Sequence, residues 1–205
     1  MRQSLDYFDD EDHWRSVQAE SRGSKLLATY YQRKAWDSSG GYDGDRMGPI
    51  YHANSMRARY EKLHDRLTKF EQKLLDVIEQ SPDLVEKRRP RWSLSKSSYI
   101  KGWQCPKYLY LDKYVPEGRT RHSEQTLAAF SEGRKFEQFV RLRGFKGAVD
   151  LGRLLGRNII HYPGFTQYFL KKRASCILYD AGFSAENVLV LADIVVKHWF
   201  WLDIY

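Results

Sequence analysis

A single aspartate stands inside a nearly all-apolar run of this 205-residue chain. The run is VLVLADIVV, residues 188–196, and Asp193 is its only charged residue. Its composition predicts a β-strand, and burying an ionised carboxylate in a strand is costly unless a cation pairs with it. Asp193 is therefore a candidate metal ligand. The alternative is an aspartate that is exposed or caps a turn at a strand end.

Cations and aromatic rings alternate along residues 86–121, where ten basic residues stand against three acidic ones. The basic residues include Arg88, Arg89, Arg91, Lys96, Lys101 and Lys107. The interleaved aromatic residues are Trp92, Tyr99, Trp103, Tyr108, Tyr110 and Tyr114. Cations neutralise phosphates and flat rings stack on bases, so this segment is a candidate nucleic-acid surface. The alternatives are a charged linker for the arginine run and a place in the core for the aromatic residues.

Three stretches carry recognisable motifs. They are LSKSSYIKGWQCPKYLYL (residues 94–111), FSEGRKFEQFVRLRGFKGAVDLG (residues 130–152) and the stretch from residue 166 to residue 205. Together they resemble a bacterial family of RecB-like nucleases of the PD-(D/E)XK kind, relatives of the CRISPR-associated RecB-like exonucleases. The resemblance covers residues 94–205, about half of the chain.

The resemblance implies a restriction-endonuclease-like core in which carboxylates hold Mg²⁺ or Mn²⁺ and a metal-bound water attacks a phosphodiester. It makes Asp193 the catalytic aspartate and a metal ligand. Glu137 lies where such nucleases often carry a metal-binding histidine, so it becomes the second candidate ligand. The residues alone also allow Glu137 to be a surface side chain beside Arg134 and Arg141 on a helix.

The family also implies parts that these residues do not contain. Its Glu-X-Lys motif follows the strand that WFWLDIY, residues 199–205, resembles, and no Glu-X-Lys stands in a suitable strand here. We therefore expect a truncated nuclease-like protein that holds metal weakly or not at all and does not cut DNA by itself. Cys105 resembles the first of four thiolates of an iron–sulfur cluster; because its three companions have no counterpart, we expect no cluster.

The elements that must position these residues predict an α/β (α+β) fold in two parts. Residues 1–90 form a mostly helical part, with a mobile loop at residues 37–49 and a coiled-coil-like helix at residues 56–80. Residues 91–205 form the N-terminal portion of an incomplete restriction-endonuclease-like core. Its predicted helices are residues 96–113, 123–142 and 164–181, and its predicted strands are residues 148–151, 188–196 and 199–205.

Two segments could mediate association. The apolar seam of helix 56–80 packs either on the second half of the chain or on another copy. Strand 199–205 would offer an unpaired edge, and such edges invite pairing with another chain. A helical interaction protein is therefore one alternative function, and a non-catalytic nucleic-acid-binding adaptor is another.

Charge and composition bound the partners. The formal net charge of +8 favours an acidic partner, so we expect weak, sequence-indifferent DNA binding that requires low salt. No apolar run approaches the roughly 18 residues of a membrane-spanning helix, which argues against a membrane partner. Two widely spaced cysteines and an acidic N-terminal stretch indicate a cytoplasmic protein.

Overall fold

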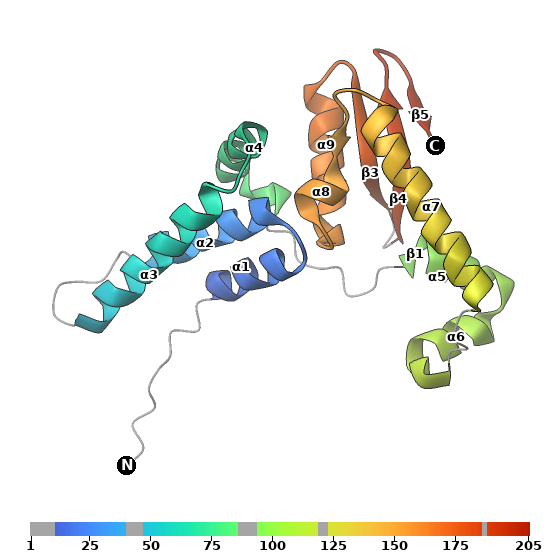
Figure 1. Cartoon of the computed structure of the whole chain (residues 1–205), viewed down its shortest axis with the longest axis horizontal. Helices are drawn as coiled ribbons and strands as arrows, with labels where there is room; N and C mark the ends of the chain where they lie inside the picture. Colours follow the sequence, from blue (N-terminus) through green and yellow to red (C-terminus); the bar gives the residue numbers. More distant parts are fainter. Residues whose placement is uncertain (1–10, 40–46, 86–93, 119–122, 186–187) are drawn as a thin grey trace. The chain divides into compact units, whose positions relative to one another are not determined.

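The computed structural model describes residues 11–39, 47–85, 94–118, 123–185 and 188–205 (Figure 1). These residues combine helices with one five-stranded mixed sheet, so the α/β class with a helical N-terminal part is confirmed. The chain divides into two compact units. Unit 1 comprises residues 1–88 and 151–164, and unit 2 comprises residues 89–150 and 165–205. The predicted division at residue 90 differs from the observed one at residues 151–164, which belong to the same unit as the N-terminal helices.

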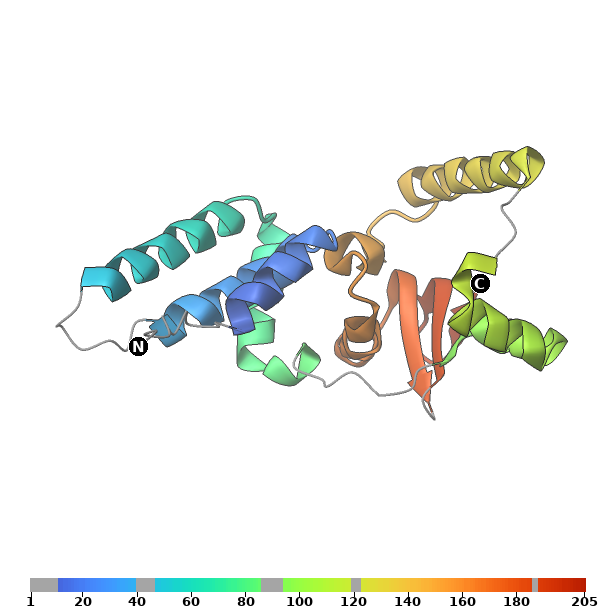
Figure 2. The ribbon, with the colours of Figure 1, turned by 90° about the horizontal axis from the view of Figure 1, so that it is seen from below.

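Unit 1 is built around a central helix. Its elements are α1 (Glu11–Ser21), α2 (Lys25–Ser39), α3 (Met47–His64), α4 (Lys69–Gln80), η1 (Pro82–Leu84), α8 (Leu151–Leu155) and η3 (Ile159–His161). Helices α1 and α2 lie side by side in both views (Figures 1 and 2). Helix α2 also contacts α3, α4 and α8, and Leu26 and Leu27 on it are completely buried.

The helix predicted at residues 56–80 is two helices. Thr68 ends the connection between them with a capping box: its hydroxyl accepts a hydrogen bond from the Glu71 amide, and the Glu71 carboxylate accepts one from the Thr68 amide. Met56, Leu63 and Leu74 of the predicted seam are buried within unit 1. A single continuous helix was therefore wrong, and these three apolar residues contribute to the core of unit 1. Self-association through residues 56–80 stays a prediction.

The loop predicted at residues 37–49 is shorter than expected. Helix α2 continues to Ser39 and α3 begins at Met47. Residues 40–46 lie outside the described part of the chain.

The segment that follows β2 joins unit 1 through close backbone contacts. The Ser24 hydroxyl donates to the Leu154 carbonyl (2.7 Å), and the Arg157 amide donates to the Arg22 carbonyl (2.7 Å). Between these bonds Gly156 adopts a left-handed φ of 56°, and a Cβ there would overlap the Arg22 carbonyl oxygen. Glycine is therefore required at this approach.

Unit 2 contains the sheet. Its elements are β1 (Leu94–Ser95), α5 (Lys96–Gln104), α6 (Pro106–Tyr114), η2 (Pro116–Gly118), α7 (Glu124–Arg143), β2 (Val149–Asp150), most of α9 (Tyr162–Lys172), β3 (Cys176–Ala185), β4 (Val188–Lys197) and β5 (Leu202–Ile204). The strand order is β1-β4-β3-β2, and β5 also pairs with β4. Strands β3 and β4 are antiparallel, β2 runs parallel to β3, and β1 and β5 pair with opposite ends of β4.

Two predicted elements of unit 2 are close to the observed ones. The helix expected at residues 123–142 is α7, and the strand expected at residues 188–196 is β4. The strand expected at residues 148–151 is reduced to β2, and the one expected at residues 199–205 is reduced to β5. Self-association through residues 199–205 stays a prediction.

Two predicted helices of unit 2 were wrong in extent. Residues 96–113 form α5 and α6, because Pro106 has no amide hydrogen to continue a helix and instead begins the second one. Residues 164–181 were expected to be helical throughout, but α9 ends at Lys172 and β3 begins at Cys176. Among the described residues, no helix is both long enough and apolar enough to cross a membrane.

Candidate functional site

Helices α5 and α6 form a tight helical pair. The Ser95 hydroxyl caps α5 by accepting a hydrogen bond from the Ser98 amide (3.2 Å). The Lys101 ammonium bonds the Asp112 carboxylate at 2.7 Å and thereby joins the two helices. The helices also approach closely, since a Cβ on Gly102 would lie 3.0 Å from a methyl carbon of Leu109.

The aromatic side chains of this pair face solvent. Neither α5 nor α6 contains a buried residue, and the Trp103 side chain is 81% exposed. The Trp103 ring stacks on Tyr99 with their centroids 6.4 Å apart. The core placement considered for the aromatic residues was therefore wrong for the five that the structure describes. These are Tyr99, Trp103, Tyr108, Tyr110 and Tyr114.

Cations accompany these rings. The Lys101 ammonium lies 5.5 Å from the Tyr108 ring centroid, and that of Lys113 lies 5.4 Å from the Tyr114 centroid. Lys96 and Lys107 are exposed. The remaining predicted positions, Arg88, Arg89, Arg91 and Trp92, lie outside the described residues. We call the five exposed rings together with Lys96, Lys107 and Lys113 the α5–α6 surface.

A second group of polar residues surrounds Arg141 near the C-terminal end of α7. Its guanidinium contacts Glu137 one turn earlier (2.6 Å), Asp150 at the end of β2 (2.8 Å) and Asp180 in β3 (2.8 Å). It also lies 5.3 Å from the ring centroid of Tyr179. Arg141 with its three carboxylates is called the Arg141 cluster below, and it joins α7 to two strands.

The electrostatics of the cluster favour the charged arginine. Burial opposes the charge, but hydrogen bonds to Asp150, Asp180 and Glu137 outweigh burial and raise the pKa of Arg141. Burial raises the pKa of the Asp180 carboxyl, and Arg141 opposes that shift. Asp180 has a left-handed φ of 55° within β3, a conformation that aspartate tolerates better than most residues.

Asp193 lies across the ladder from this cluster. Tyr179 pairs with Ile194 and Ala181 pairs with Ala192, so the register places Asp193 opposite Asp180. Asp193 is exposed, however, and the argument from a buried charge was wrong. Its role as a catalytic residue and metal ligand stays a prediction.

Glu137 adopts the alternative arrangement, a pair with Arg141 one helical turn away. Within the described ranges, no group of three or more His, Cys, Asp or Glu side chains is arranged to hold a metal ion. The structure thus brings Glu137, Asp150 and Asp180 around a guanidinium. A ligand role for Glu137 also stays a prediction.

Sequence reasoning missed Arg141, Asp150 and Asp180 as members of a cluster. A signal for Asp180 existed, because it is the only charged residue of the run CILYDAGFSA, as Asp193 is of its own run. The expectation of a helix through residue 181 concealed that similarity. Of the cysteines, Cys105 is exposed and Cys176 is buried.

No protein-family model, no curated protein and no solved structure matches this chain. The RecB-like resemblance therefore rests on the quoted motifs, and functional proposals rest on the side-chain arrangements above.

Proposed function

We propose that the protein binds nucleic acid with unpaired bases through the α5–α6 surface. One observation carries this proposal: two paired helices present five aromatic rings to solvent among exposed lysines. Folding ordinarily removes such rings from water, because burying apolar surface stabilises the folded state by about 25 cal/mol per Å². A function that uses the rings explains why they remain outside the core.

The ligand follows from the chemistry of the surface. Stacking of a base on an aromatic ring contributes about 1–3 kcal/mol and is insensitive to sequence, because every base has a flat face. Bases within a duplex stack on one another and offer few free faces. The lysines add a phosphate attraction that falls as salt rises. These features favour a single strand over a duplex and predict little dependence on base sequence.

Fluorescence anisotropy with a labelled strand and a duplex, each of about 20 nucleotides, tests the proposal. We expect tighter binding of the single strand at about 50 mM salt and a steep loss by about 200 mM. Trp103→Ala with Tyr110→Ala should weaken binding at least about tenfold, the loss of one stacking interaction or more.

Lys96→Glu with Lys107→Glu should also weaken binding. The matched control is Lys69→Glu with Lys73→Glu, because both lysines are exposed on α4 and the charge change is identical. Equal losses of affinity in the two lysine-to-glutamate variants would contradict a role for the α5–α6 surface. Unchanged affinity in the variant that combines Trp103→Ala with Tyr110→Ala would contradict it too.

A second candidate is a metal-dependent phosphodiesterase lineage. The register that places Asp193 opposite Asp180 favours it, because carboxylates on paired strands can share a hard cation. Arg141 already engages Asp180. We therefore expect Mg²⁺ or Mn²⁺ to bind weakly at most and the 205-residue chain not to cleave DNA.

Mn²⁺ titration followed by electron paramagnetic resonance tests this candidate, with cleavage of labelled DNA measured in parallel. Weak binding that disappears in Asp193→Ala would support it. Mn²⁺ binding that is equal in Asp193→Ala and in the unaltered protein would remove Asp193 as a ligand. Asp193-dependent cleavage would show that other groups complete the site.

A further inference from the structure

The tip of the β4–β5 hairpin presents a second set of aromatic residues. The His198 amide donates to the Trp201 carbonyl (3.0 Å), so Trp199 and Phe200 form the turn. Their side chains are 74% and 91% exposed. Neither residue contributes to the core, and both point their apolar surface at solvent.

Side-chain contacts within the hairpin stabilise its tip. The His198 ring stacks on Trp201 with centroids 4.8 Å apart and an interplanar angle of 26°. His198 Nε2 lies 3.1 Å from the Asp203 carboxylate on β5. These contacts hold the Trp201 ring in place while leaving it exposed, so little side-chain entropy remains to be lost when a ligand binds.

Lys197 connects the hairpin to the C-terminal end of α9, where three basic residues follow one another: Lys171, Lys172 and Arg173. Its ammonium donates to the carbonyls of Leu170 (2.5 Å) and Arg173 (2.8 Å) at the end of α9. The last residues of α9 therefore lie beside the tip, and these residues are exposed. We call the combined group the hairpin-tip cluster: Lys171, Lys172, Arg173, Trp199, Phe200 and Trp201.

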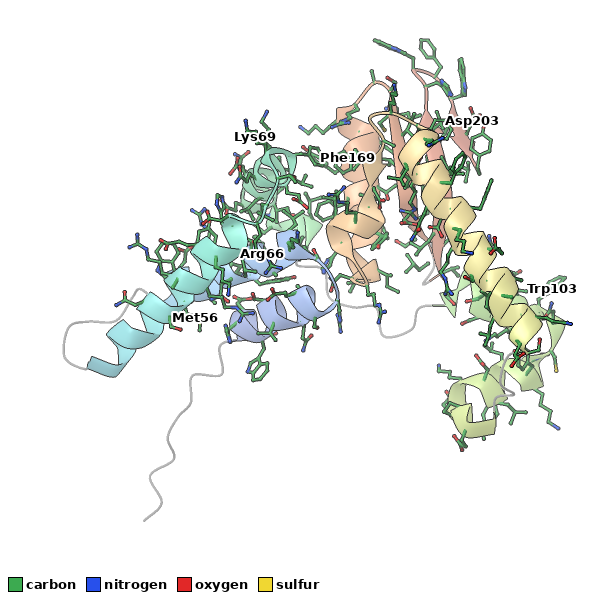
Figure 3. The ribbon with its side chains drawn as sticks, viewed as in Figure 1. Met56, Arg66, Lys69, Trp103, Phe169 and Asp203 are labelled. Carbon is green, nitrogen blue, oxygen red and sulfur yellow. The ribbon has the colours of Figure 1, made fainter. Side chains whose placement is uncertain are left out.

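The two aromatic and basic surfaces lie at opposite ends of β4. Strand β1 pairs with Val188 and Leu189 at the start of β4, and α5 follows β1 directly. The hairpin lies beyond Lys197, the last residue of β4. Nine residue steps of about 3.3 Å separate these ends by roughly 30 Å. Figure 3 shows Trp103 toward one end of unit 2 and Asp203 toward the other.

We propose that the hairpin-tip cluster is a second contact for the nucleic-acid strand that binds the α5–α6 surface. This inference rests on the proposed function. Both clusters lie beyond the ends of β4, so at a rise of about 3.4 Å per nucleotide a strand in stacked geometry needs at least roughly nine nucleotides to reach both. Strands shorter than this bind through one cluster at a time.

Charge complementarity favours a nucleic acid at the tip. Three cations beside the aromatic tip match a polyanion, and the rings match its bases. An anionic membrane surface offers charge too, but the same combination of rings and lysines recurs at the far end of β4. A single extended polyanion uses both clusters.

Length dependence is the expected signature. Once one cluster has bound the strand, binding to the other cluster is intramolecular, with an effective concentration in the millimolar range. The overall affinity therefore exceeds that of either cluster alone. We expect oligothymidylates of about 12–20 nucleotides to bind at least about tenfold more tightly than those of about 6 nucleotides.

Anisotropy titrations of the full chain test this inference. Trp199→Ser with Phe200→Ser, and separately Lys171→Glu with Lys172→Glu, should abolish the gain with length. The shortest strand should lose much less affinity, because the α5–α6 surface can still bind it. The control is again Lys69→Glu with Lys73→Glu, which should retain the gain. Circular dichroism verifies that each variant is folded.

The outcomes separate the two proposals. Long-strand binding that depends on Trp103 but not on either hairpin variant overturns the hairpin-tip inference and leaves the α5–α6 surface standing. Loss of all binding in the Trp103 variant together with loss of the length gain in the hairpin variants supports both. No binding of the longest strand overturns both.

Two further measurements would assign the hairpin tip to another partner. Vesicles of phosphatidylserine and phosphatidylcholine that sediment the unaltered protein but not the hairpin variants, with DNA binding unchanged, overturn the inference in favour of a membrane surface. Concentration-dependent dimerisation abolished by the same variants, again with DNA binding unchanged, overturns it in favour of a second copy.

Discussion

Arg141→Met should loosen α7 from the sheet. Methionine keeps an unbranched apolar stem but removes the three ion pairs to Glu137, Asp150 and Asp180. The effect should be large, because α7 contributes no buried side chain and therefore depends on polar contacts for its position.

The structure sets the magnitude. The side chains of Asp150 and Asp180 are only 25% and 23% exposed, so both carboxylates are mostly withdrawn from water when the Arg141 cation is removed. Leaving a buried polar group unsatisfied costs about 1–3 kcal/mol. The pair with Glu137 is more exposed and adds only about 0.3–0.5 kcal/mol. Protonation of Asp180 relieves part of the cost, which leaves a loss of about 2–4 kcal/mol at neutral pH.

The dependence on pH separates charge from packing. Burial raises the pKa of Asp180 and Arg141 opposes the rise, so removing Arg141 raises that pKa further. A carboxyl with a raised pKa in the folded state costs stability when ionised and ceases to do so as pH falls through that pKa. The deficit of Arg141→Met should therefore shrink as the pH is lowered from neutral. A packing defect would give a deficit independent of pH.

Hydrogen exchange with mass spectrometry, together with urea unfolding at several pH values, measures both effects. Amides of α7 should exchange faster in Arg141→Met, and those of β3 and β4 should change less. The control is Arg134→Met on the same helix, where an exposed arginine is replaced. Equal exchange in the two variants, or a loss below about 0.5 kcal/mol, would refute the reasoning.

Further predictions concern two glycines and the two cysteines. Gly156→Ala should destabilise unit 1 by about 3 kcal/mol, because φ is left-handed and the new Cβ overlaps the Arg22 carbonyl. Gly133→Ala, which meets nothing within 4 Å, should stabilise α7 by up to about 1 kcal/mol; thermal unfolding that ranks these two variants the other way would contradict the structure. Cys105 is exposed and burial raises the pKa of the Cys176 thiol. A maleimide should therefore modify Cys105 in the folded protein and Cys176 only after unfolding; equal rates would be inconsistent with these placements.

Local patterns allowed some elements to be predicted. Strand β4 was predicted because nearly all of its residues are apolar and many of them are valine. Helix α7 was also predicted close to its observed bounds, and in the structure the Ser123 hydroxyl caps it by accepting a hydrogen bond from the Thr126 amide. The break before α4 was also present in the sequence as Thr68 and Glu71, but the apolar period continued across it and hid the cap.

Other features depend on tertiary packing and could not be predicted from local patterns. Asp193 has apolar neighbours, and whether it is buried depends on which faces of the sheet the helices cover. The Arg141 cluster joins residues that lie 39 positions apart in the chain, so it requires the pairing of β2 with β3. The aromatic residues of α5 and α6 carry the composition of a core, and only the structure places them in solvent.

Side chains of unit 2 are buried unevenly, and this affects how nucleic-acid binding by α5 and α6 should be measured. Its core lies between α9 and the sheet, where Phe165, Leu178 and Val195 are completely buried. Helices α5, α6 and α7 bury no side chain. Elements with few buried apolar contacts open at low free-energy cost.

Salt therefore acts on two processes at once. It screens the attraction between lysines and phosphates, and to a smaller extent it screens the part-buried pair of Lys101 with Asp112 that joins α5 to α6. A steep salt dependence of binding by itself does not measure phosphate contacts. If exchange of the α5 and α6 amides is unchanged between low and high salt without nucleic acid, the slope reports counterion release. If exchange accelerates over the same range, part of the slope belongs to separation of the helical pair, and fewer phosphates are bound than the slope implies.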